Sequence, residues 1–173
     1  MKGEKWHTAL RWLAYYGLLL LFYCLQTTPG FFSIAGIKPV FVLPLAVCVC
    51  MFEEVIPAAC FSMTAGFLWD ISSDQLFGFN ALIFFCCGAA ISLLCIYYFH
   101  SKMPNSLLFG AAVLLIQNGM DLVFGYLMWG VQGSGMIFLT QMLPTTGYTM
   151  LFFPPVFYLI RKVSGGREDL TGA

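Results

Sequence analysis

Long apolar runs separated by short polar segments make up most of the sequence. A helix rises 1.5 Å per residue and the hydrocarbon core of a bilayer is about 30 Å thick, so about 20 apolar residues can cross it. Six runs are candidates for membrane helices: residues 12–25, 39–52, 55–69, 79–99, 107–129 and 136–160. We therefore expect an all-α integral membrane protein built as a six-helix transmembrane bundle.

The second and third runs are too short to cross the hydrocarbon core easily. The pair Glu53-Glu54 and Pro57 separate them, and two adjacent glutamates are very costly at a bilayer midplane. We therefore expect two short helices set deep in the bundle. The glutamates themselves are expected to form a solvated turn.

The first and last runs contain residues that predict how their helices are built. Trp12, Tyr15 and Tyr16 begin the first run and are suited to the aromatic belt at a membrane interface. The last run contains Pro144 and Pro154-Pro155, so we expect that helix to be broken.

The polar ends of the chain bound a single domain. We expect a basic cytoplasmic tail over residues 1–11, the six-helix transmembrane domain over 12–160, and a polar cytoplasmic tail over 161–173. No linker is long enough to indicate a second domain. The first run also lacks the small-residue cleavage motif of a signal peptide, so we expect it to be retained.

The basic residues predict the orientation, because lysine and arginine in short loops favour the cytoplasmic side. Six crossings place both termini on one side. With that side inside, Lys38 is the only basic residue outside, whereas the cytoplasmic side carries Lys2, Lys5, Arg11, Lys102, Arg161, Lys162 and Arg167. We expect the chain in a bacterial inner or plasma membrane with both termini cytoplasmic.

Composition supports the bilayer as the solvent. The chain is 60% hydrophobic and 9% charged, whereas soluble domains carry about 25% charged residues. The formal net charge of zero argues against a nucleic-acid partner.

The residues that usually carry chemistry are few. All seven cysteines lie in apolar runs, which suits neither a disulfide framework nor a zinc site, so we interpret them as small packing residues. His7 and His100 are far apart, and phosphate-loop, nucleophile-elbow and metalloprotease motifs are missing. We expect no enzyme activity, no cofactor and no metal.

Asp121 lies near the middle of the fifth run, where an ionised carboxylate costs at least about 2.5 kcal/mol. Gln117 and Asn118 precede it by four and three residues, so the three side chains are expected to share one helix face. This face can contact a partner helix, bind a ligand group or act as a protonatable switch. The interpretation we prefer is a hydrogen-bonded lock inside the bundle.

The most patterned stretch runs from residue 58 to residue 82. Ala58, Ser62 and Gly66 are spaced four apart, so they form a small-residue face that allows another helix to approach closely. That face packs either within the bundle or against a partner protein.

The helix that carries this face is expected to end at Trp69-Asp70. A carboxylate at a helix C-terminus faces the unfavourable end of the dipole, so we expect a backbone amide of the 71–75 turn to compensate Asp70. Asp70 is either a turn-forming residue or part of a corner that docks a partner.

The same stretch resembles the signature region of the MreD family, the rod-shape-determining membrane proteins of bacteria. The resemblance rests on Gly66-x-x-x-Asp70, then Gly78-x-Asn80-x-Leu82, with Pro39 opening the second run. It implies a fold similar to the S-components of energy-coupling-factor vitamin transporters. It also implies a non-catalytic role in the cell-wall elongation complex that builds lateral peptidoglycan. The implied partners are MreC and, through it, MreB filaments, RodA and a class B penicillin-binding protein.

The alternative function is a vitamin-binding S-component itself. Such a protein needs a ligand pocket near the outer face, which Trp69, Asp70 and Asn80 could line. It also needs small-residue faces that dock a transport subunit, and Ala58-Ser62-Gly66 is a loose version of that pattern.

Overall fold

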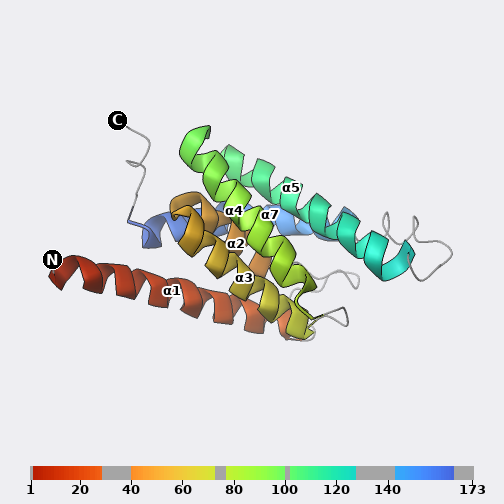
Figure 1. Ribbon diagram of the computed structural model, residues 1–173, viewed down its shortest axis with the longest axis horizontal. Coiled ribbons are helices and arrows are strands. Elements are labelled where there is room, and N and C mark those ends of the chain that lie inside the picture. The colour runs from red at the N-terminus through yellow and green to blue at the C-terminus, as the bar shows by residue number, and fades with distance from the viewer. Residues whose placement is uncertain (1, 29–39, 73–76, 100–101, 128–142, 166–173) are drawn as a thin grey trace.

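The computed structural model describes residues 2–28, 40–72, 77–99, 102–127 and 143–165 (Figure 1). Within these ranges seven helical elements follow one another: α1 (Lys2–Thr27), α2 (Val42–Phe52), α3 (Val55–Ser72), α4 (Phe79–Tyr97), α5 (Met103–Asp121), η1 (Leu122–Leu127) and α7 (Leu143–Val163). The element η1 is a π-helix that directly continues α5. The described ranges contain no strand, so the all-α prediction is confirmed.

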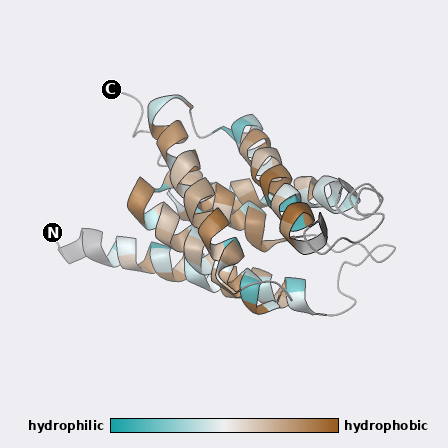
Figure 2. Cartoon of the chain, turned by 45° about the vertical axis from the view of Figure 1, so that its right-hand side comes forward, coloured by the Kyte–Doolittle hydropathy of each residue, from teal (hydrophilic) through white to brown (hydrophobic). Residues whose placement is uncertain are grey.

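Four helices are long and apolar enough to cross a membrane: Trp6–Thr27 of α1, Val55–Ser72 of α3, Phe79–Tyr97 of α4, and Met103–Phe124 of α5 with the start of η1. The other two predicted spans correspond to α2, which has only 11 residues, and α7, which carries Arg161 and Lys162 in its last turn. In Figure 2 apolar residues run along the helices between more hydrophilic ends.

The short helix α2 forms the centre of the bundle. Every one of its residues is buried, and it contacts α1, α3, α4, α5 and α7, which surround it in Figure 1. A helix that is apolar on all sides is stable only where neighbours cover every face. The expectation of a short helix set deep in the bundle is therefore confirmed for α2.

The amides at the start of α2 are satisfied by other helices. The side-chain oxygen of Gln26 in α1 accepts hydrogen bonds from the N–H groups of Phe41 and Val42 at 3.1 and 3.3 Å. The Thr149 hydroxyl of α7 accepts one from the N–H of Val40 at 3.1 Å. These contacts meet the donors that a helix N-terminus leaves open.

Several helices differ from the predictions, and α5 for example begins at Met103, four residues before its predicted start. α3 continues to Ser72, beyond the predicted end at Trp69, and so becomes long enough to cross a membrane. α1 already begins at Lys2, so the predicted basic tail is the first part of a helix.

α7 is continuous through Pro154-Pro155, because proline keeps a helical φ and the carbonyls it frees can be satisfied by neighbouring groups in a bundle. Pro144 lies in the first turn of α7, where no N–H donor is needed.

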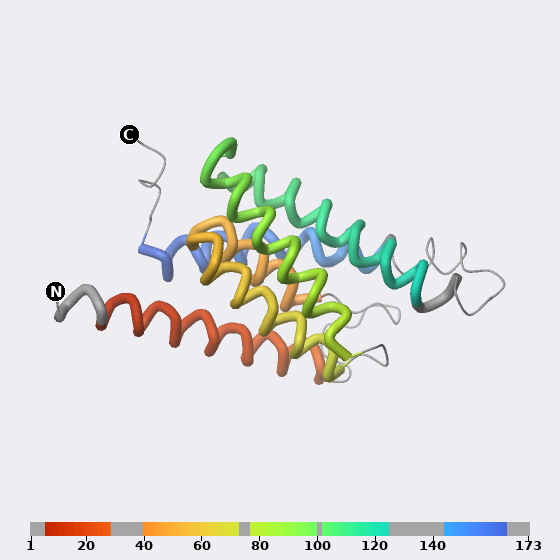
Figure 3. Tube along the Cα trace, in the orientation of Figure 1, coloured from red at the N-terminus to blue at the C-terminus, as the bar shows by residue number. Residues whose placement is uncertain are grey.

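The helices alternate in direction, so their ends gather at two ends of the bundle. The start of α1 and the end of α7 lie on the same side in Figure 3. We call this side the Glu53 end, because the turn between α2 and α3 lies there. The opposite side, where α3 ends and α4 begins, is the Asp70 end.

Candidate functional site

Asp70 is the capping residue of α4, although it belongs to α3. Its Oδ2 accepts hydrogen bonds from the N–H groups of Gly78 and Ala81 at 2.9 and 3.2 Å, and its Oδ1 accepts one from Asn80 at 3.1 Å. The residue is only 3% exposed. A carboxylate is favourable there because a helix N-terminus has open N–H donors and a positive dipole end. These amides lie beyond the 71–75 turn in which we expected them.

Two glycines allow this arrangement, each for a different reason. Gly78 has φ of 93°, a left-handed conformation that side chains with a Cβ rarely adopt. Gly66 lies where α3 and α4 cross: a Cβ there would be 2.5 Å from the Ala81 Cα and 2.8 Å from the Asn80 carbonyl oxygen. Gly66, Asp70, Gly78 and Asn80, which we call the Asp70 corner, therefore form one structural unit.

The small-residue face of α3 packs within the bundle. Ser62 lies 2.9 Å from the Cys50 sulfur of α2, Oγ to Sγ, and a Cβ on Gly88 of α4 would be 2.5 Å from the same hydroxyl. Ala58 is fully buried, and its carbonyl lies 3.7 Å from the Cys50 sulfur. The small-residue face was expected to pack either within the bundle or against a partner protein. In the structure it packs within the bundle.

Trp69 lies beside this face and is half-buried. Its ring packs edge-on against Phe84 of α4, with the ring centroids 6.0 Å apart. The tryptophan therefore braces α3 against α4.

The polar residues of α5 bind two different helices. The Gln117 side-chain amide donates a hydrogen bond to the Asn80 side-chain oxygen of α4 at 3.3 Å. Asn118 donates one to the Thr146 hydroxyl of α7 at 2.8 Å. The expected common face is therefore divided, because successive helix residues point about 100° apart. Asp121 is half-buried and is the last residue of α5 before η1.

The Asn80–Gln117 pair leaves two polar atoms unused. Asn80 is 0% and Gln117 2% exposed. The Asn80 Nδ2 donor and the Gln117 Oε1 acceptor have no hydrogen-bond partner among the described residues. Buried amide atoms without a partner are rare.

A buried ionic cluster at the Glu53 end was missed by the sequence analysis. Arg11 approaches Glu53 with Nε–Oε1 at 3.0 Å and Nη2–Oε2 at 3.2 Å. The Tyr15 hydroxyl donates to Glu53 Oε1 at 3.1 Å, and the Ser92 hydroxyl donates to the Glu53 carbonyl at 2.8 Å. The prediction of a solvated Glu53-Glu54 turn is therefore wrong for Glu53, which is 6% exposed, and holds for the exposed Glu54.

The same cluster corrects the prediction for Tyr15, which is a fully buried core residue rather than an interfacial one. The sequence contains a signal for this arrangement: Arg11 and Tyr15 are four residues apart on the face of α1 that meets the acidic turn. The sequence does not show, however, that α1 packs against the turn between α2 and α3.

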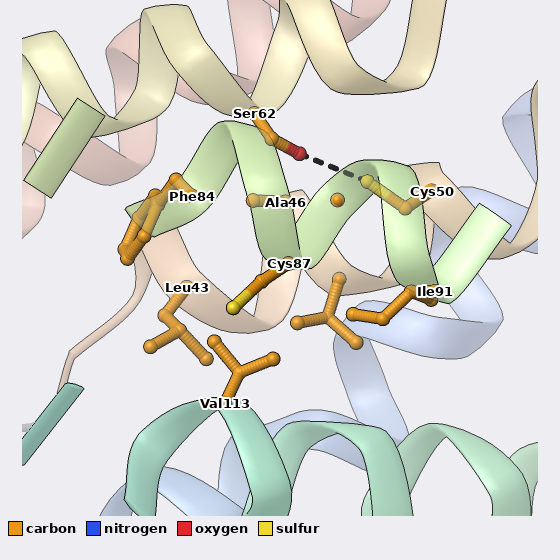
Figure 4. A pocket seen from close by; sticks show the side chains of 10 residues that line it. Leu43, Ala46, Cys50, Ser62, Phe84, Cys87, Ile91 and Val113 are labelled. Carbon is orange, nitrogen blue, oxygen red and sulfur yellow. Dashed lines mark hydrogen bonds between the residues drawn. The ribbon is translucent and has the colours of Figure 1, made fainter. Parts of the chain in front are cut away.

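The described residues contain a small cavity but no cluster of side chains suited to a metal ion. They contain no group of three or more histidine, cysteine or acidic side chains placed to hold a metal. Cys48, Cys50 and Cys95 are buried and Cys24, Cys60 and Cys86 are exposed, all as free thiols. A cavity of ≈ 10 Å³ lies between α2, α3, α4 and α5 (Figure 4), which is room for about one water.

Pro39 and His100, two of the residues named in the sequence analysis, lie outside the described residues. No family model matches the chain, and neither the curated proteins nor the solved structures yield a significant match.

Proposed function

We propose that this chain is a non-catalytic integral membrane component of a bacterial cell-wall elongation complex, the role that its resemblance to the MreD family implies. The observation that supports the proposal is the Asp70 corner. Four of the five residues that carry the resemblance in the described ranges meet in one interlocked contact between α3 and α4, and the fifth, Leu82, is exposed. A signature built from residues that shape the fold is what a structural scaffold requires.

In the proposed arrangement the chain crosses the membrane six times, with α2 and α7 completing the four longer spans. Both termini and the Glu53 end are cytoplasmic, and the Asp70 end faces outward. The bundle contributes to rod shape and lateral peptidoglycan synthesis by binding MreC, and through it MreB, RodA and a class B penicillin-binding protein.

The vitamin-binding alternative has less support. The cavity found among the described residues is lined by none of Trp69, Asp70 and Asn80, the residues that this alternative would place around its ligand. Asp70 and the Asn80 backbone, which that alternative would place in a pocket, bind each other.

The test is affinity purification of the tagged chain from native membranes in a mild detergent. Recovery of MreC with the wall synthases supports the proposal, whereas recovery of an ATPase transport module supports the S-component alternative. The tagged chain should also restore rod shape to cells depleted of the untagged protein. Cells that stay rod-shaped after depletion would contradict the proposal.

A further inference from the structure

The facing surfaces of α4 and α5 form a seam that is polar at one end and apolar farther along. The polar end is the Asn80–Gln117 pair. Phe84 follows Asn80 by one helical turn on α4, and Val113 precedes Gln117 by one turn on α5. Both Phe84 and Val113 line the cavity, so it begins one turn inward from the two amides.

The cavity is a narrow apolar slot. Phe84, Cys87 and Ile91 line it from α4 and Val113 from α5, and α2 contributes four lining residues, Leu43 among them. Figure 4 shows these side chains pointing into one space, with the Ser62–Cys50 contact at its edge. In Figure 1 the end of α4 lies near the start of α5, and the two helices diverge toward the Asp70 end, where the two amides bridge them.

The unused atoms specify what fits the polar end. Asn80 Nδ2 can donate a hydrogen bond and Gln117 Oε1 can accept one. A group that satisfies both must offer an acceptor and an N–H or O–H donor close together. Both residues are buried, and neither unused atom has appreciable contact with solvent, so a group reaches them only when α5 moves away from α4.

We infer that the α4–α5 seam binds one membrane lipid, with its headgroup on Asn80 and Gln117 and an acyl chain in the slot between Phe84 and Val113. The order of polarity along the seam carries this assignment: hydrogen-bonding groups lie near the end of the bundle and apolar groups lie toward its middle, which is the order of a lipid in one leaflet. A separation of α4 and α5 admits the chain and provides partners for both amide atoms. The lipid carries a headgroup with both a donor and an acceptor.

Phosphatidylethanolamine and phosphatidylcholine with identical acyl chains test this chemistry. Both have phosphate acceptors, but the ethanolamine headgroup has N–H donors and the choline headgroup has none. The full chain is purified from an equimolar mixture of the two lipids, and the retained lipid is identified by native mass spectrometry. We expect the ethanolamine lipid to be retained about tenfold over the choline lipid, the ratio that one or two hydrogen bonds supply.

Three variants assign the effect to the seam. Gln117→Met keeps the side-chain volume but removes the amide, and should abolish the headgroup preference. Val113→Phe should fill the slot and reduce the retention of both lipids. Asn118→Leu is the matched control: it removes a neighbouring amide that binds Thr146 of α7 and should leave the preference unchanged.

Photolabelling with a lipid that carries a diazirine on its acyl chain keeps the test informative even if a variant is unstable. The wild-type chain should be labelled on the peptides that contain Phe84–Ile91 and Val113. Equal retention of both lipids by the wild type, an undiminished preference in Gln117→Met, or labelling confined to other helices would overturn the inference. Each of those results indicates lipid that surrounds the bundle without occupying the seam.

Discussion

The carboxylate of Asp70, two residues before the end of α3, accepts a 2.9 Å hydrogen bond from the backbone N–H of Gly78, the residue that precedes α4. Two further amides of α4 bind the same carboxylate. One acidic side chain therefore joins the end of one helix to the start of the next, and Gly66 lets the two helices cross closely beside it.

Replacing Asp70 by alanine should destabilise the bundle by about 3 kcal/mol, because three backbone amides, two of them in buried hydrogen bonds, lose a charged acceptor. Asp70→Asn retains one oxygen acceptor and should cost less. The measurement is thermal unfolding of the purified chain in detergent. Ser72→Ala is the control, since the Ser72 hydroxyl is exposed and donates a local hydrogen bond to the Trp69 carbonyl of its own helix. An Asp70→Ala protein as stable as the wild type would show that the cap contributes little.

Adding one methyl group at Gly66 should lower the amount of protein in the membrane. A Cβ there would be 2.5 Å from a backbone atom of α4, so the helices must separate, at a cost of about 1–3 kcal/mol. Gly17→Ala is the matched control, because nothing lies within 4 Å of its Cβ position. Immunoblotting of membranes measures both. A Gly66→Leu protein that accumulates normally but loses MreC would instead place this face in an interface with a partner.

Glu53→Gln should destabilise the Glu53 end by about 3 kcal/mol, because it leaves Arg11 partly buried without its partner charge. The exposed neighbour Glu54 supplies the control, and Glu54→Gln should be neutral. The double variant Arg11→Met/Glu53→Gln should recover part of the loss. Additive effects in this double-mutant cycle, measured by unfolding in detergent, would show that the two residues do not interact energetically.

Asp121→Asn should be tolerated if Asp121 is a structural lock, because the amide keeps a hydrogen-bonding shape without the charge. Asp121→Leu should lower stability in detergent, since it removes that capacity from a half-buried position. The readouts are unfolding temperature and rescue of rod shape. A folded, abundant Asp121→Asn protein without function would show that the charge itself is required.

Reporter fusions measure the proposed topology. A fusion after Gly135 should report an extracytoplasmic position, and fusions after Lys102 and Arg167 should report cytoplasmic ones, because the lysine and arginine bias favours that orientation. An extracytoplasmic reading at Arg167 would remove the six-span arrangement.

The sequence by itself determined the helical class, the apolar helices and the positions of the polar residues within them. Those properties depend on local composition and periodicity, and a run such as residues 79–97 is long and apolar enough to form a helix whichever neighbours it packs against. The same kind of reasoning identified α2 as a short helix. Two adjacent glutamates are costly inside the bilayer, so the apolar segment before them has to end there.

Only the tertiary structure decided which polar residues meet. Glu53 was expected to be solvated, but the packing of α1 places Arg11 and Tyr15 against its carboxylate. Gln117 and Asn118 were expected to share one polar face, but Gln117 binds Asn80 of α4 and Asn118 binds Thr146 of α7. Asp70 looked like the end of α3 but is the cap of α4. Such pairings depend on where helices cross, and crossings are set by the packing of all helices together rather than by the residues near each one in sequence.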